Sequence, residues 1–312
     1  MIKIDVSIKT IENFKKEVLL NFYDEKNNIS IYKKEDKKKR IKWAVDINAI
    51  NRLIKRKLKN YHKELDLEKL IVLTYDELCD LKEFMDKNKS FVELNKTQKD
   101  YFYTLYERLK KPQYINDLGI TVCPYCNRNY IFNFQKSNSL NATAQLDHFF
   151  DKSSYPFFSV SIFNLVPSCG TCNQRKSKKQ DEIYHPFNEA LNDDVKFRLK
   201  IKDSKFYYDK NSLEIENEII NNEVKVKSHI EIFNIDNLYN EHKDVVLELI
   251  QKAQIYNESY IDELYQKYEG TLFKNREDVL RHITGGHVED GDISKRPLSK
   301  LIKDISEELE LI

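Results

Sequence analysis

The sequence has almost no net charge and no long apolar run. Its 52 lysine and arginine residues nearly balance its 51 aspartate and glutamate residues, which gives a net charge of +1. A protein that attracts nucleic acid through an overall basic surface is therefore excluded, and any such binding must come from local clusters. No run of 18 apolar residues occurs, so we expect no membrane-spanning helix and no membrane partner.

A secretory signal is also absent, and cysteines are few. The first nine residues, MIKIDVSIK, contain no apolar central region, so we expect no signal peptide and a cytoplasmic location. In a cytosolic protein, five cysteines in 312 residues indicate a metal site rather than disulfides. With 40% apolar and 33% charged residues, the composition is typical of a soluble globular protein and not of a disordered chain.

Hydrophobic spacing predicts an α+β fold in three parts. Residues 1–118 are expected to be mostly helical. Residues 119–190 hold four of the six prolines and are expected to form a compact, turn-rich unit. Residues 191–312 are expected to form a small antiparallel β element followed by helices. The expected elements are helices over 47–65, 102–109, 245–268 (with Asp236 as N-cap) and 297–311, and strands at 195–201, 213–215 and 224–226.

Four of the five cysteines form two pairs with the spacing of zinc ligands. The first pair is Cys123-Pro-Tyr-Cys126 and the second is Cys169-Gly-Thr-Cys172. Two such pairs can complete a tetrahedron around Zn²⁺ and leave no open coordination position. Because the metal would close the long loop between the pairs, we expect it to contribute on the order of 10 kcal/mol of folding free energy. A redox-active dithiol would need only one such pair.

Near the cysteines stand Asp147, His148 and Asn173, residue types that suit the hydrolysis of a phosphodiester. That reaction needs an activated water, a cation on the phosphate and stabilisation of the leaving oxygen. A histidine, with an unperturbed pKa of about 6.5, can accept the proton of the water near neutral pH. Mg²⁺ prefers oxygen ligands and usually takes one or two protein groups, and Asp147 and Asn173 can provide two such oxygens.

The adjacency of Asp147 and His148 sets a geometric condition. Neighbouring side chains on a strand point to opposite faces, so a strand end or a bulge must re-aim one of them if both are to reach one phosphate. Asn173 follows Cys172, where a helix is expected to begin. Zinc would then fix that helix start relative to the strand, so a structural metal would set the geometry of a catalytic one.

The order Cys-x-x-Cys, Asp-His, Asn-Leu and Cys-x-x-Cys-Asn-x-x-Lys resembles the HNH endonucleases with a zinc-bound ββα-metal core, over about residues 120–180. The resemblance implies that His148 is the general base and that Asp147 and Asn173 hold a catalytic Mg²⁺ or Mn²⁺. It also implies that Asn164 braces the loop between the two strands. An ordinary loop asparagine at position 164 fits the sequence as well.

The strings Leu-Asp-His-Phe-Phe-Asp-Lys and Asn-Leu-Val-Pro-Ser-Cys-Gly-Thr-Cys-Asn are similar to the PtuB-type HNH nucleases of Septu and retron anti-phage systems. This likeness implies a defence effector that acts on DNA beside an ATPase partner subunit. Two positions depart from the family pattern: Asp151 stands where a proline is usual, and Asn173 stands where many members carry histidine. Both are compatible with activity, since asparagine still offers an oxygen ligand.

Basic residues follow the second cysteine pair. We expect Arg175, Lys176, Lys178 and Lys179 to lie on a helix beside the metal site, where they would hold the phosphate backbone on either side of the cut. The alternating basic face at 196–202 either binds DNA or faces water. For His185, packing or hydrogen bonding in a loop is favoured over a place in the active site.

Two other functions fit parts of the pattern. A zinc-stapled adaptor could bind nucleic acid or protein without cutting, although a degenerate domain would be expected to lose at least one of Asp147, His148 and Asn173. A zinc-dependent enzyme of another class is disfavoured because four cysteines leave no open position on the metal. The sequence thus predicts a metal-dependent HNH endonuclease, a phosphodiester hydrolase with a structural zinc.

Overall fold

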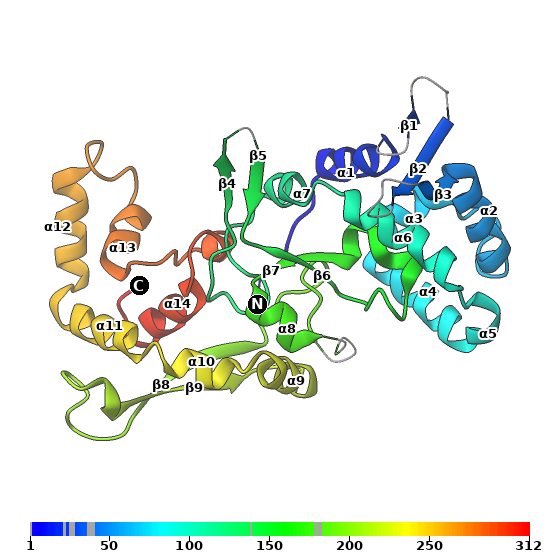
Figure 1. Ribbon diagram of the computed structural model, residues 1–312. Coiled ribbons are helices and arrows are strands. Elements are labelled where there is room, and N and C mark those ends of the chain that lie inside the picture. The colour runs from blue at the N-terminus through cyan, green and yellow to red at the C-terminus, as the bar shows by residue number, and fades with distance from the viewer. Residues whose placement is uncertain are drawn as a thin grey trace.

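The computed structural model describes residues 2–20, 23–24, 29–35, 41–137, 139–177, 179 and 183–312. Within these residues helices predominate, and the strands form four small antiparallel sheets. The α+β class predicted from the sequence is therefore confirmed. Figure 1 shows the N-terminal helices on one side of a central unit, and the C-terminal helices on the other side.

The N-terminal part is mainly helical. The helix predicted over 47–65 ends earlier, because the chain turns back after Leu58 and the backbone N–H of Leu67 donates to Asn51 Oδ1 over 2.8 Å. Side chains cap several of the helices, as with Thr74 and Asn95, each of which accepts a backbone N–H three residues ahead. The elements are α1 (Ile8–Leu20), β1 (Tyr23–Asp24), β2 (Ile29–Glu35), β3 (Ile41–Asp46), α2 (Ile47–Leu58), α3 (Leu67–Ile71), α4 (Tyr75–Lys87), α5 (Lys89–Val92), α6 (Lys96–Arg108) and α7 (Lys111–Leu118).

The central unit is short in regular structure and rich in turns. It begins with a cysteine-containing turn and continues into a hairpin of β4 (Asn133–Lys136) and β5 (Ser139–Ala142). A second antiparallel pair follows, formed by β6 (Gln145–His148) and β7 (Leu165–Ser168) with the short 3₁₀ helices η1 (Pro156–Val160) and η2 (Ile162–Asn164) between them. The helix α8 (Gly170–Lys176) begins directly after β7, so the order here is strand, strand, helix.

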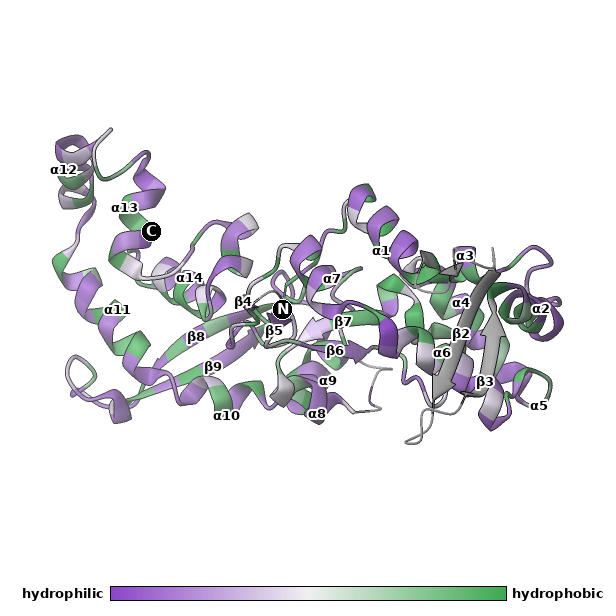
Figure 2. Cartoon of the chain, turned by 45° about the horizontal axis from the view of Figure 1, so that its top comes forward, coloured by the Kyte–Doolittle hydropathy of each residue, from purple (hydrophilic) through white to green (hydrophobic). Residues whose placement is uncertain are grey.

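The C-terminal part differs from the prediction in two places. The predicted strand at 224–226 lies in a helix, where Val226, Ile230 and Phe233 are buried at helical spacing. The predicted helix over 245–268 is two helices, because Asn257 accepts the backbone N–H of Tyr260 and starts a new one. Asp236, predicted as an N-cap, lies inside a helix. The elements are β8 (Val195–Ile201), η3 (Lys210–Ser212), β9 (Leu213–Ile219), α9 (Glu223–Phe233), α10 (Ile235–Asn240), α11 (Lys243–Ile255), α12 (Glu258–Tyr268), α13 (Arg276–Thr284), η4 (Asp290–Lys295) and α14 (Ser299–Glu308). Figure 2 shows hydrophobic and hydrophilic stretches alternating along α10, α11 and α14, as amphipathic helices require.

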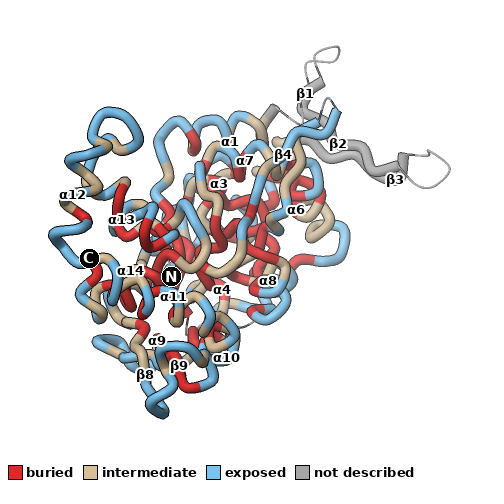
Figure 3. The backbone as a smooth tube through the Cα atoms, turned by 90° about the vertical axis from the view of Figure 1, so that its left-hand side faces the viewer, coloured by how far each residue is buried: buried red, intermediate tan, exposed pale blue. Residues whose placement is uncertain are grey.

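One hydrophobic core runs through all three parts. The same cluster of buried side chains includes Ile115, Val166, Val195 and Leu301. Figure 3 shows the buried segments gathered in the interior, with the exposed ones around them. The segment before α1 also enters the centre, since the backbone N–H of Ile2 donates to Pro124 O over 3.0 Å. In the described part of the chain, every helix is too short or too polar to span a bilayer.

Side chains cover both outer edges of the sheet formed by β8 and β9. On β8, the backbone N–H of Phe197 donates to Asp304 Oδ2 over 2.9 Å. On β9, Asn240 bonds both the N–H and the C=O of Ile215. Asp304 and Lys300 are both buried and form an ion pair of 2.7 Å. These contacts satisfy backbone groups that an edge strand would otherwise expose.

We predict that Asp304→Ala lowers the free energy of unfolding by about 3–5 kcal/mol, because it leaves the ammonium of Lys300 and the N–H of Phe197 buried without this partner. The measurement is equilibrium unfolding in urea. The matched control is Asp290→Ala, whose carboxylate pairs with Lys303 but is 85% exposed, and we expect a loss of less than about 1 kcal/mol there. Equal losses for the two variants would contradict the prediction.

Candidate metal centre and active-site pocket

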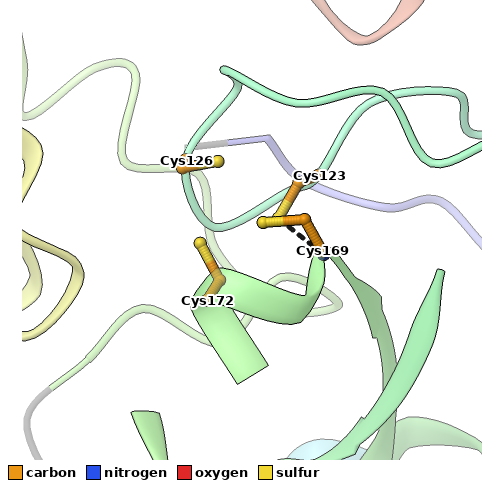
Figure 4. A group of neighbouring side chains, drawn as sticks. All are labelled: Cys123, Cys126, Cys169 and Cys172. Atoms are coloured by element: carbon orange, nitrogen blue, oxygen red, sulfur yellow. Dashed lines mark hydrogen bonds between the residues drawn. The ribbon is translucent and has the colours of Figure 1, made fainter. Parts of the chain in front are cut away.

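The four cysteines lie together, as the spacing predicts. Cys123 and Cys126 come from the turn after α7, Cys169 is the N-cap of α8, and Cys172 lies in its first turn. All four are buried, and their sulfur atoms lie within 4.8 Å of one another (Figure 4). Zn–S bonds of about 2.3 Å place the sulfurs of a tetrahedral site roughly 3.8 Å apart, so this group could hold a structural zinc with little movement.

Hydrogen bonds to sulfur support a thiolate site. The backbone N–H of Arg128 donates to Cys126 Sγ over 3.4 Å, and that of Cys169 donates to Cys123 Sγ over 3.3 Å. The side-chain amide of Asn129 donates to Cys169 Sγ over 3.3 Å. Donors aimed at sulfur stabilise thiolates and fix the direction of metal ligands.

Each carbonyl of the turn Cys123–Cys126 accepts a hydrogen bond. The carbonyl of Cys123 accepts from the N–H of Asn127, whose backbone is left-handed at φ 49°. The carbonyl of Pro124 accepts from the N–H of Ile2 in the N-terminal segment. The carbonyl of Tyr125 lies 2.9 Å from His229 Nε2 on α9, and that of Cys126 accepts from Tyr239 Oη on α10 over 2.6 Å. The turn therefore joins both flanking parts of the chain to the metal centre.

Asn164 ties together the two ends of the loop between β6 and β7. It is fully buried, and its Oδ1 accepts the backbone N–H of Phe150 over 2.7 Å. Its Nδ2 donates to the carbonyls of Phe150 and Phe158, each over 3.1 Å. These bonds tie the residue before β7 to Phe150 and Phe158 in the loop that follows β6.

A cavity of about 340 Å³ opens beside the end of β6. Asp147 and His148, the last two residues of β6, and Asn173 on α8 all contribute to its wall, so the three predicted catalytic residues lie in one place. The full lining is Tyr106, Leu146, Asp147, His148, Asp151, Lys152, Asn173 and Ser177.

The ring of His148 is held in one orientation and one tautomer. Its Nε2 lies 3.1 Å from the carbonyl oxygen of Ser159, and its ring centroid lies 4.4 Å from that of Tyr106. Because a carbonyl oxygen only accepts, Nε2 carries the hydrogen, and Nδ1 of the neutral ring keeps its lone pair. Burial, aided by the charge of Lys152, lowers the pKa of His148 to about 3, so the ring is neutral at pH 7.

Asp147 points the other way, into the protein. Its carboxylate is 4% exposed, and its Oδ2 accepts from Tyr125 Oη over 2.7 Å and lies 3.1 Å from Lys176 Nζ. The Oδ1 atom lies farther from Lys176, at 3.4 Å. Burial raises the pKa of Asp147, while the ammonium of Lys176 and the hydroxyl of Tyr125 oppose that rise. The opposite directions of Asp147 and His148 are those expected for neighbours on a strand.

The side chain of Asn173 is oriented by β6. Its Nδ2 donates to Gln145 Oε1 over 2.7 Å. That bond turns the amide so that its oxygen is on the side away from Gln145. Asn173 follows Cys172, so the cysteine cluster and Gln145 together fix its place at the cavity wall.

The basic residues after the second cysteine pair do not form one group, and Lys179 lies beyond α8, which ends at Lys176, instead of on the predicted helix. Lys176 departs from the prediction, since it is fully buried and its ammonium also donates to the carbonyls of His148 and Phe149 over 3.1 and 2.9 Å. In this position it holds β6 and cannot reach a phosphate in the cavity. Arg175 and Lys179 are exposed, and Lys178 lies outside the described residues.

Lys152 occupies the place that Lys176 was expected to fill. It lines the cavity, and its Nζ lies 4.7 Å from the ring centroid of Tyr106. Lys111 Nζ lies 3.9 Å from the same ring centroid, so two cations stand around the aromatic wall of the cavity. An anionic group entering the cavity would meet positive charge at this rim.

The other residues considered from the sequence have structural roles. His185 is buried, stacks on Tyr75 with centroids 4.0 Å apart, and has its pKa lowered to about 3 by burial. It is outside the cavity lining, in agreement with the favoured packing role. The basic face of β8 is neutralised by glutamates, in the pairs Lys196–Glu307, Arg198–Glu218, Lys200–Glu216 and Lys202–Glu214.

Three residues at the site were missed from the sequence. Tyr125 lies inside the first cysteine pair, and its place between two metal ligands could have suggested a role behind the site. Lys152 follows the Asp-His pair by four residues, so it also lay within the motif. Ser159 acts through its carbonyl oxygen, a group that every residue has, and no sequence signal could identify it.

We predict that Cys169→Ser lowers the zinc content by one equivalent and leaves an unfolded or insoluble protein, because a zinc held by the four cysteines would supply on the order of 10 kcal/mol of folding free energy. Metal content by mass spectrometry and far-ultraviolet circular dichroism measure the two effects. The control is Cys79→Ser on α4, outside the cluster, which should keep the zinc and the fold. A folded Cys169→Ser protein with a full equivalent of zinc would contradict the prediction.

Comparisons with known proteins give one partial likeness. No protein-family model matches the chain, and no solved structure gives a significant match. The protein ea31 of Escherichia phage lambda is 29% identical over 110 residues, which cover 33% of this chain and 33% of that protein. The chain therefore matches about a third of the length of this curated relative, and its function has to be argued from the site itself.

Proposed function

We propose that the protein is a metal-dependent HNH-type endonuclease that hydrolyses phosphodiester bonds of DNA. One observation carries the proposal. A single cavity is lined by the neutral imidazole of His148, by Asn173 and by Lys152, with the inward-turned carboxylate of Asp147 behind its wall, on a strand–strand–helix unit whose helix begins at a four-cysteine cluster. A water activator, donors for a cation and a cation for the phosphate are the parts that the reaction needs.

The donor set fits a hard divalent cation. Asn173 would offer its Oδ1 to Mg²⁺ or Mn²⁺, since its nitrogen donates to Gln145, and Asp147 would offer its Oδ1 once that atom leaves its hydrogen bond with Lys176. When bound, the cation would supply positive charge to the scissile phosphate and to the leaving oxygen. The cysteines would keep the separate structural zinc.

The residues of the cavity have separate roles in the proposed reaction. Nδ1 of His148 takes a proton from a water molecule while the water oxygen forms its bond to phosphorus. The bond from phosphorus to the leaving oxygen breaks, and that oxygen takes a proton from solvent. Lys152 holds the phosphate at the rim, and Ser159 keeps the histidine ring in the orientation that presents Nδ1.

Lys176 is a positioning residue in this proposal. Its ammonium bonds Asp147 and the carbonyls of His148 and Phe149, so it fixes both side chains of the Asp-His pair through the end of β6. Arg175 and Lys179 follow the second cysteine pair, and both are exposed. They remain candidates for contacts with the backbone of a longer substrate.

A second function has an observation in its favour. The carboxylate of Asp147 is already engaged by Tyr125 and Lys176, as it would be in an adaptor that uses this aspartate only to hold its fold. Such a protein would be a zinc-stapled module that binds nucleic acid or protein without cutting. A role in anti-phage defence with an ATPase subunit rests on the family resemblance, and an ATPase gene beside this one would support it.

We predict that His148→Ala abolishes the Mg²⁺-dependent cleavage of plasmid DNA, lowering the rate by at least about 100-fold, because the proton acceptor is lost. Gel electrophoresis of a cleavage time course measures the rate. His62→Ala, at an exposed histidine away from the cavity, is the control and should cut at the wild-type rate. Wild-type protein that binds DNA and never cuts it, with Mg²⁺ or Mn²⁺ present, would favour the adaptor.

We predict that substitutions of Lys152 and Lys176 change different quantities, the KM in one case and the free energy of unfolding in the other. Lys152→Ala should raise KM on the order of tenfold with little loss of stability, because it removes a cation at the cavity rim. Lys176→Ala should lower the free energy of unfolding by about 3–5 kcal/mol, because it leaves the carboxylate of Asp147 buried without its ion pair. Steady-state cleavage kinetics and urea unfolding separate the two. A purely kinetic effect of Lys176→Ala on a fully stable protein would contradict this assignment.

A further inference from the structure

The hairpin that leads into β6 carries exposed aromatic rings on one face. Tyr130, Phe132 and Phe134 alternate along the chain that leads into β4 and are 44%, 44% and 46% exposed. The rings of Tyr130 and Phe132 are stacked, with centroids 4.3 Å apart and planes 22° apart. We call these three residues the aromatic face. Large apolar rings in a row at the surface need an explanation, since isolated exposed rings are common and contiguous ones are not.

The other residues on this side of the hairpin are polar, whereas the opposite side packs on the protein. Side chains alternate along an extended chain, and Phe134 pairs with Asn141 while Lys136 pairs with Ser139. The opposite side carries the buried Ile131, and Ala142 packs against the main core. The hairpin is thus anchored by one side and presents rings, hydrogen-bonding groups and a lysine on the other.

The charge around the aromatic face suits a polyanion. The chain holds 51 acidic residues in 312, yet none occurs between Asp117 and Asp147. Arg128 and Lys136 are the charged residues of that stretch. The basic face of β8 is different, because each of its cations has a glutamate partner. A segment whose charged residues are all cationic favours a partner that carries phosphates.

We infer that the aromatic face binds single-stranded nucleic acid by stacking unpaired bases on Tyr130, Phe132 and Phe134. The inference rests on the proposed endonuclease function and narrows its substrate to nucleic acid with an unpaired segment. Tyr130 and Phe132 cover one face of each other, so one unpaired base can stack on the outer face of this pair and another on Phe134. A duplex keeps the faces of its bases inside its own stack and offers none to these rings.

The aromatic face is connected to the cavity by a short piece of backbone. The backbone N–H of Thr143 donates to the carbonyl of Phe132 over 2.8 Å, so the two residues are neighbours across the hairpin. Thr143 precedes Asp147 by four residues, which is at most about 14 Å of extended chain. A strand held on the aromatic face can therefore place a phosphate a few nucleotides away at Asp147 and His148.

The test is fluorescence anisotropy with a labelled 20-nucleotide oligo-thymidine and a fully paired duplex of the same length, without added Mg²⁺, on the His148→Ala background so that nothing is cut. We expect the single strand to bind at least tenfold more tightly than the duplex. Phe132→Ala and Phe134→Ala should each weaken single-strand binding on the order of tenfold. Phe132→Trp should bind the single strand like wild type, because it keeps an aromatic ring. Phe132→Leu should bind it as weakly as Phe132→Ala, because leucine keeps apolar volume without a ring.

The matched control is Tyr208→Ala, an aromatic that is 71% exposed away from the hairpin and should have no effect. Equal binding by wild type, Phe132→Ala and Phe134→Ala overturns the inference, whether or not the protein cuts DNA. A Phe132→Leu variant that binds like wild type also overturns it, because the ring is then not needed. A face that drives self-association in light scattering and holds no oligonucleotide overturns it too, and indicates a protein contact. Ring-dependent binding by a protein that never cuts supports the aromatic face and removes the endonuclease.

Discussion

The four-cysteine cluster is the constraint on which the rest of the central unit depends. Its sulfur atoms connect the turn Cys123–Cys126 to the first turn of α8, although the two segments are far apart in sequence. The hydrophobic core also holds them, since all four cysteines belong to the same buried cluster as Phe149 and Val166. A metal bound by the four sulfurs would add to that core, because the strands between are four residues long and pair only in twos.

The same turn organises the flanking parts of the chain. Its carbonyls receive hydrogen bonds from the N-terminal segment and from His229 and Tyr239 on two C-terminal helices. The side chain of Asn127 donates to Ile293 O and accepts the N–H of Lys300, which attaches the start of α14. Loss of the cluster would therefore release contacts on both sides of the molecule, and not only the cavity.

How far the sequence predicted the site depends on the distance over which each residue acts. The cysteines, Asp147, His148 and Asn173 act within short turns and strand ends, so their order along the chain carried the information. The burial of Lys176 was missed because it depends on where α8 lies against β6. The sequence pattern of a lysine after a helix start is the same whether that lysine is buried or exposed. The strand predicted at 224–226 failed for a similar reason, since Val226 is buried through the packing of α9, which a three-residue alternation cannot reveal.

The net charge is close to zero, but charged residues are unevenly distributed along the chain, and this distribution sets the local electrostatics. Where cations and carboxylates alternate, as on β8 and its neighbours, they pair and leave little field. Where carboxylates are absent, from residue 118 to residue 146, the chain forms the cysteine turn, the hairpin and the start of β6. The first acid after this stretch is Asp147, and it is turned inward against Lys176. The local sequence, and not the composition, therefore sets the charge of the hairpin, while Asp151 and Lys152 both line the cavity that follows it.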